Sequence, residues 1–249
     1  MKHKRTSDAD QGRSTIGLHR MNTKAKSEEE DTPFSSIEAI LPLVKKPGRY
    51  IGGELNSVNK SWSEAAVRFC LIFPDLYEIG MSHQGLQILY HLLNRDDRFL
   101  AQRCYAPDID FEARLREKDL SLFALESRRP LTDFDVLGFT LPYELCYTNI
   151  LTILDLAGLP LRACDRDENY PLVIGGGSCC LNPEPIADFF DAIVLGDGEE
   201  VIFELGECLL AAKQSALTKD QILRNMAAIN GVYIPALFKP LYNLSLIHI

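Results

Sequence analysis

The sequence lacks any long apolar run. No stretch reaches the roughly 18 uninterrupted apolar residues of a membrane span, and the first residues are charged rather than apolar as in a signal peptide. We therefore expect a cytoplasmic protein without a membrane partner. Hydrophobic residues make up 46% and charged residues 24% of the 249 positions, which excludes a fibrous or wholly disordered chain.

The sequence also lacks cysteines at metal spacing. None of its seven cysteines form a C-x2-C or C-x3-C-x2-C pattern, the spacings that hold zinc or an iron–sulfur cluster. The cysteines are odd in number and lie in apolar runs, unlike those of secreted proteins with a disulfide framework. We therefore expect reduced thiols. Neither G-x-G-x-x-G nor Gly-Lys-Ser/Thr occurs, which removes the usual signatures of dinucleotide and P-loop sites.

Positive charge is scarce outside the first residues. The net charge is −9, and residues 1–31 hold seven Lys/Arg and six Asp/Glu, so 26 − 7 = 19 positive and 35 − 6 = 29 negative charges remain. A folded part with a net charge of about −10 is a poor general binder of polyanions, because counterion release needs clustered Lys and Arg. Nucleic acid stays open only as a locally bound substrate of a full-length protein.

Short apolar runs without polar alternation predict strands that are buried on both faces. Such strands are typical of a parallel sheet covered by helices. Helical patterns follow the runs, so we predict an α/β protein with a flavodoxin-like or Rossmann-like doubly wound parallel sheet. Ligands of such sheets bind beyond the carboxyl ends of the strands. We expect strands at 67–73, 134–141, 172–174, 192–195 and 230–235, and helices at 86–93, 145–154, 199–212 and 218–230.

Composition divides the chain into five predicted parts. Residues 1–34 resemble a disordered tail that starts at Met1 or Met21, and residues 35–62 form a lead segment whose short helix Ser35 or Ser36 would cap. Residues 63–215 form the α/β domain, and residues 216–243 form a linker and the start of a further domain. Residues 244–249 translate CTG TCT CTT ATA CAC ATC, a transposon end used in library preparation, so we expect a truncated reading frame; a genuine terminal strand is the alternative.

Glycine-rich loops follow two of the predicted strands. Missing side chains let a ligand approach backbone N–H groups, although a tight turn with positive φ and ordinary helix capping are alternatives. The candidate binding residues in these two loops are Gly175, Gly176, Gly177, Ser178, Gly196, Gly198 and Glu199.

Polar residues follow two further strands. The loop 74–85 contains Ser82, His83 and Gly85, and His83 is a candidate metal ligand or proton carrier, or else a polar residue that begins a helix. Glu144 follows the strand at 134–141, where it would complement a helix dipole or contact a ligand. No Ser-His-Asp or Cys-His set can be assembled from the sequence.

In combination these segments resemble a known family. The stretches 74–94, 103–117, 123–151, 173–200 and 230–238 are similar to the N-terminal cobalamin-binding-like region of a class of radical S-adenosylmethionine (radical SAM) proteins. The resemblance covers roughly residues 35–240 and implies the flavodoxin-like cobalamin-binding fold. In that fold, Thr140 and the run Gly175–Gly177 would line the side that holds the nucleotide tail.

Two departures from the family's patterns stand out. Cobalamin domains that replace the lower axial ligand use Asp-x-His-x-x-Gly, whereas His83 has neither an Asp two residues before it nor a Gly three residues after it. Ligation of cobalt by this histidine is therefore not expected. The [4Fe–4S] cluster and S-adenosylmethionine need three cysteines at C-x3-C-x2-C. We expect that motif in a catalytic domain that would follow and be this domain's partner.

The resemblance implies a cofactor-binding domain of a radical SAM enzyme, inactive as a fragment, with cobalamin as its ligand. Two alternatives stay open. The first is a non-catalytic interaction module of the same fold that has lost cobalamin. The second is a nucleotide- or flavin-binding enzyme, which depends on the fold and the glycine run alone.

Overall fold

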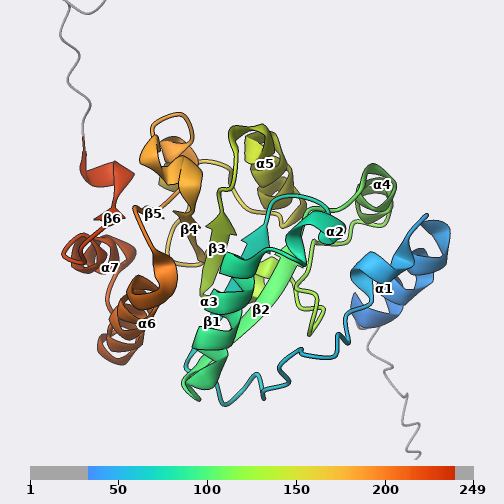
Figure 1. The fold of residues 1–249 in the computed structure, drawn as a ribbon, viewed down its shortest axis with the longest axis horizontal. Helices are drawn as coiled ribbons and strands as arrows, with labels where there is room; N and C mark the ends of the chain where they lie inside the picture. Colours follow the sequence, from blue (N-terminus) through green and yellow to red (C-terminus); the bar gives the residue numbers. More distant parts are fainter. Residues whose placement is uncertain (1–32, 239–249) are drawn as a thin grey trace, which may run out of the picture. The chain divides into compact units, whose positions relative to one another are not determined.

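A computed structural model describes residues 33–238, all within one compact unit of the chain. Its centre is a six-stranded sheet (Figure 1) with the order β2-β1-β3-β4-β5-β6. Neighbouring strands from β2 to β5 are parallel, and β6 is antiparallel to β5. The strands are β1 (Val67–Phe73), β2 (Phe99–Tyr105), β3 (Val136–Thr140), β4 (Leu172–Gly176), β5 (Ala192–Val194) and β6 (Val232–Tyr233).

Helices cover both faces of the sheet because the strands are apolar on both sides (Figure 1). One face packs against α3 (Gln84–Arg95), α6 (Gly198–Ser215) and α7 (Lys219–Met226). The other packs against α1 (Pro33–Ile40), α4 (Ile109–Glu117) and α5 (Tyr147–Leu156). The predicted doubly wound α/β fold is confirmed.

Short helical segments fill the connections between these elements. The four-residue helix α2 (Tyr77–Gly80) follows β1. The 3-10 helices are η1 (Leu41–Leu43), η2 (Pro47–Tyr50), η3 (Leu131–Asp133), η4 (Glu144–Cys146), η5 (Ala163–Asp165), η6 (Ser178–Leu181), η7 (Ala187–Phe189) and η8 (Pro235–Leu237).

The strand order reverses between β1 and β3. From β1 the chain moves outward to β2, returns to β3 on the other side of β1, and then continues to β4 and β5. This 2-1-3-4-5 order is that of flavodoxin-like sheets, in which ligands bind at the carboxyl ends of the strands where the order reverses. The carboxyl ends of β1 and β3 therefore mark the place to look for a site.

Several elements differ from the sequence-based expectations. Strand β2 and helix α4 were not predicted, and β6 joins the sheet beside β5 rather than leaving the domain. Helix α1 begins at Pro33, so Ser35 and Ser36 lie inside the helix and do not cap it. Residues 1–32 of the predicted tail 1–34 fall outside the described residues, whereas residues 33 and 34 lie in α1. The predicted tail 244–249 also falls outside the described residues, and the other predicted domain boundaries stay predictions. Among the described residues, no helix is both long and apolar enough to cross a membrane.

Candidate functional site

A cavity of about 220 Å³ lies over the carboxyl ends of the central strands. The ends of β1, β3, β4 and β5 form its floor, and α3 and the first turns of α6 form its walls. It therefore occupies the place where the strand order reverses, on the face of the sheet that α3 and α6 cover (Figure 1).

Two glycines create the cavity. Gly138 of β3 lies in register between Leu71 of β1 and Ile174 of β4, so the middle of this row has no side chain. In the next row along the strands, Gly176 has Thr140 and Val194 as its register partners. A Cβ atom at Gly176 would meet only the Cβ of Val194, at 3.9 Å, so it would project into open space. The cavity is a gap in the side-chain layer of the sheet.

The lining of the cavity is mostly apolar. Helix α3 contributes Leu86 and Leu89, and α6 contributes aliphatic side chains from its first two turns. Thr140 adds a hydroxyl at the floor, whereas the carboxylates of Asp197 and Glu199 are exposed. Such a lining suits a flat apolar group whose polar end lies toward the solvent.

The glycines of the two predicted loops are subject to different structural constraints. Gly177 and Gly196 have φ values of 121° and 111°, which residues other than glycine rarely adopt. The backbone conformation therefore explains the presence of glycine at both positions. Gly175 faces the other side of the sheet, because its Cβ would lie 2.8 Å from Leu141 Cδ1. Gly176 has neither constraint. The turn interpretation therefore holds for Gly177 and Gly196, but it does not explain Gly176.

His83 is the N-terminal cap of α3. Its Nδ1 accepts a hydrogen bond from the backbone N–H of Leu86 at 3.2 Å, and burial lowers the pKa of its imidazole. The neutral ring consequently carries its proton on Nε2, which leaves no free nitrogen lone pair for a metal in this state. Within residues 33–238 there is also no group of three His, Cys, Asp or Glu side chains that could hold a metal ion.

The cavity collects most of the residues predicted from sequence. Three lie elsewhere and are exposed: Ser82 hydrogen bonds to the carbonyl of Ile79, Ser178 hydrogen bonds to that of Pro142, and Glu144 begins η4. Nine line the cavity, namely His83, Gly85, Thr140, Gly175, Gly176, Gly177, Gly196, Gly198 and Glu199.

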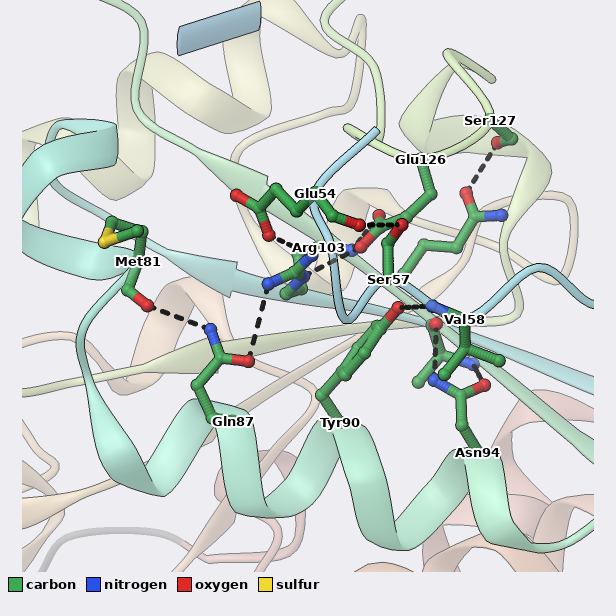
Figure 2. Close-up of polar contacts among 12 residues, drawn as sticks. Glu54, Ser57, Val58, Met81, Gln87, Tyr90, Asn94, Arg103, Glu126 and Ser127 are labelled. Atoms are coloured by element: carbon green, nitrogen blue, oxygen red, sulfur yellow. Dashed lines mark hydrogen bonds and ion pairs between the residues drawn. The ribbon is translucent and has the colours of Figure 1, made fainter. Parts of the chain in front are cut away.

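A buried polar cluster, which the sequence did not reveal, holds α3 in place (Figure 2). The Arg103 side chain is only 4% exposed and pairs with Glu126 (Nε to Oε1, 2.7 Å) and with Glu54 (Nη2 to Oε2, 2.5 Å). On the helix side, its Nη1 donates to Gln87 Oε1 at 3.4 Å, and its guanidinium lies 4.5 Å from the centre of the Tyr90 ring.

The same cluster fastens the lead segment to the sheet (Figure 2). The backbone N–H of Val58 donates to the Tyr90 hydroxyl at 2.7 Å. The Tyr77 hydroxyl donates to Glu54 at 2.5 Å. Burial and this bond to Glu54 raise the pKa of Tyr77 to about 12. The Arg103 cluster thus joins β2, the lead segment and the helix that carries one wall of the cavity.

Comparison with known proteins identifies the family to which the chain belongs. The model described as radical SAM proteins, N-terminal, matches residues 85–235, which is more than half of the chain. The chain belongs to this family. The match runs from the first turn of α3 to the start of η8, so it includes nearly all of the cavity lining.

An uncharacterized protein of the archaeon Methanocaldococcus jannaschii is 24% identical to this radical SAM region over 140 residues. The alignment covers 54% of the chain, and the chain spans about a quarter of that relative's length, 25%. No solved structure matches the chain.

Proposed function

We propose that this region is the cofactor-binding domain of a radical SAM enzyme and that its cavity holds the nucleotide tail of cobalamin. The observation that carries the proposal is the apolar gap left by Gly138 and Gly176 at the carboxyl ends of the strands. Membership in the radical SAM N-terminal family supports it, because radical enzymes use cobalamin among their cofactors.

The size of the cavity fits one end of this ligand. Sites for whole drug-sized molecules are about 300–1,000 Å³, whereas this cavity is about 220 Å³. An aromatic base could enter between Leu89 of α3 and the glycines of the floor, while the corrin ring would remain on the exposed edge of the sheet. Flat apolar surface buried in this way would supply most of the binding free energy.

The start of α6 offers hydrogen-bond donors beside the mouth. The first N–H groups of an α-helix have no intrahelical partner, and the Asp197 side chain makes no capping hydrogen bond to those of α6. The phosphate of a nucleotide tail would accept from these groups, and the Thr140 hydroxyl would meet the base from the floor. When bound, cobalamin supplies radical and group-transfer chemistry. The residues of this chain would orient it and keep water from its tail.

One observation favours a second function, that of an interaction module without cobalamin. Nδ1 of His83 already accepts the N–H of Leu86, so the imidazole of His83 does not replace the lower ligand of cobalt. This does not conflict with a tail-binding cavity, because an anchored tail does not require the histidine. The two functions differ in whether the chain retains cobalamin at all.

Gel filtration after incubation with hydroxocobalamin tests the proposal. The chain should retain the chromophore with a shifted visible spectrum, and Gly176→Leu should abolish retention because its side chain would enter the cavity. Gly48→Leu is the matched control: a Cβ at Gly48 in η2 would meet nothing within 4 Å, and this residue does not line the cavity, so the variant should leave retention intact.

Other results of the gel-filtration experiment would count against the proposal. If the wild-type chain retains no cobalamin, the proposal fails and the interaction module is favoured. Retention of flavin mononucleotide instead would favour the flavin-binding alternative. Retention that Gly176→Leu does not change would show that the ligand binds outside the cavity.

A further inference from the structure

Exposed aliphatic side chains gather at the edge of the sheet where the cavity opens. Each of the five parallel strands is followed by a connection that exposes at least one of them. Because the carboxyl ends of parallel strands lie at one edge, these side chains surround the same end of the domain. We call this set the apolar collar: Ile79, Met81, Ile109, Leu145, Leu181 and Leu195.

Leu145 and Leu181 are the most exposed members of the collar, at 87% and 86%. They come from η4 and η6, which follow the neighbouring strands β3 and β4. The two loops are joined by hydrogen bonds from Cys179 N to Leu141 O at 3.1 Å and from Ser178 Oγ to Pro142 O at 2.9 Å. The two leucines therefore stand on connected loops.

The backbone holds both leucines outward. Cys146, the residue after Leu145, and Cys180, the residue before Leu181, are buried in the core on the α5 side of the sheet. In so short a turn, a buried neighbour fixes the direction of the adjacent side chain. The exposure of the two leucines is thus built into the turns, and a protein stabilises such a surface by covering it.

The chain returns to the same edge just before β6. The backbone N–H of Leu195 donates to Gly231 O at 2.7 Å, and the Tyr233 hydroxyl donates to Glu184 Oε1 at 2.7 Å. Glu184 lies in the connection that follows β4 and η6. The turn into β6 therefore lies next to the collar, and β6 then runs back from this edge, antiparallel to β5.

We propose that Leu145 and Leu181 anchor the part of the radical SAM protein that follows this region, the part that would carry the iron–sulfur cluster. The family model describes the region as N-terminal, and the aligned part makes up 25% of the M. jannaschii relative, so family members extend beyond this region. The docked surface would be apolar opposite the two leucines and basic opposite Asp197 and Glu199. It would close the mouth of the cavity.

Hydrogen exchange tests the anchor without any ligand, and the inference depends on family membership rather than on cobalamin. The protein encoded by the complete reading frame is compared with the 249-residue chain. Peptides that span residues 144–147 and 178–181 should exchange at least tenfold more slowly in the complete protein. Peptides around Leu55, which is 99% exposed in the lead segment, serve as the control and should exchange equally in both.

The double variant Leu145→Ser with Leu181→Ser identifies the anchors. Burial of one leucine corresponds to about tenfold or more in a binding constant, so the variant should return both segments to the exchange rates of the 249-residue chain. The matched variant Leu55→Ser should leave the protection unchanged. Equal exchange in both proteins, protection that survives the double variant, or a reading frame that ends at residue 249 would overturn the proposal. Failure of cobalamin binding would appear separately, as lost retention of the chromophore.

Discussion

Replacing Arg103 with methionine removes the cation from a buried cluster that holds two carboxylates. Its partners Glu126 and Glu54 are 8% and 23% exposed, so at least one carboxylate would remain buried without a counterion. Removing one partner of a buried pair costs about 3–5 kcal/mol. Since about 1 kcal/mol corresponds to about 2–4 °C in a domain of this size, Tm should fall by about 6–20 °C.

The loss should depend on pH in a defined direction. Burial raises the pKa of Glu126 even with Arg103 beside it. A carboxyl whose pKa is raised in the folded state destabilises the protein as the pH rises above the ordinary value of about 4.3. Without Arg103 this pKa should rise further. The difference in unfolding free energy between wild type and Arg103→Met should therefore be largest near pH 7.5 and smaller near pH 5.

Chemical denaturation followed by the fluorescence of Trp62, the single tryptophan, measures this difference. Arg103→Met combined with Glu126→Gln is the matched control, because the amide keeps an acceptor for the backbone N–H at position 103 and carries no charge. The double variant should recover at least about 1 kcal/mol at pH 7.5. Equal losses at both pH values, with no recovery in the double variant, would refute the argument from an unpaired buried charge.

Three further predictions concern the cap, the floor of the cavity and the opposite end of the sheet. His83→Ala should cost about 1 kcal/mol in unfolding free energy. Since burial lowers the pKa of His83, acidification below the ordinary histidine pKa of about 6.5 should progressively protonate the ring, remove the cap in the wild type and shrink the difference; a loss independent of pH would contradict the capping role. Gly138→Val should lower hydroxocobalamin retention by filling the floor between β1 and β4, and unchanged retention would place the ligand elsewhere. Asp191→Asn should cost about 3–5 kcal/mol in thermal denaturation, because Arg166 and Lys219 both pair with this buried carboxylate; a loss under 1 kcal/mol would contradict it.

The central strands were predictable because each is a continuous apolar run. Strand β1 has the predicted bounds, and the glycine run 175–177, at the end of β4, lines the cavity. Strand β2 was missed because Gln102 and Arg103 interrupt its apolar pattern. Their partners Ser127 and Glu126 lie more than twenty residues away, and only the folded chain brings them together.

Gly138 was missed for a related reason. Gly138 lines the cavity because β3 lies between β1 and β4, which makes Leu71 and Ile174 its neighbours. The order of the strands cannot be predicted from a local sequence pattern. Conversely, Ser178 belongs to the predicted glycine loop, but its hydroxyl bonds to Pro142 rather than facing the cavity. The sequence therefore predicted which loops lie near the cavity. The register of the strands determines which residues line it.

A comparison of hydroxocobalamin with cobinamide, which has the same corrin ring but no nucleotide tail, tests the central claim most directly. The proposed site of the nucleotide tail is the cavity between α3, α6 and the glycines of the sheet. A spectral titration of the 249-residue chain should therefore show saturable binding of hydroxocobalamin and at least tenfold weaker binding of cobinamide. Equal affinity for the two ligands, or binding of neither, would contradict it.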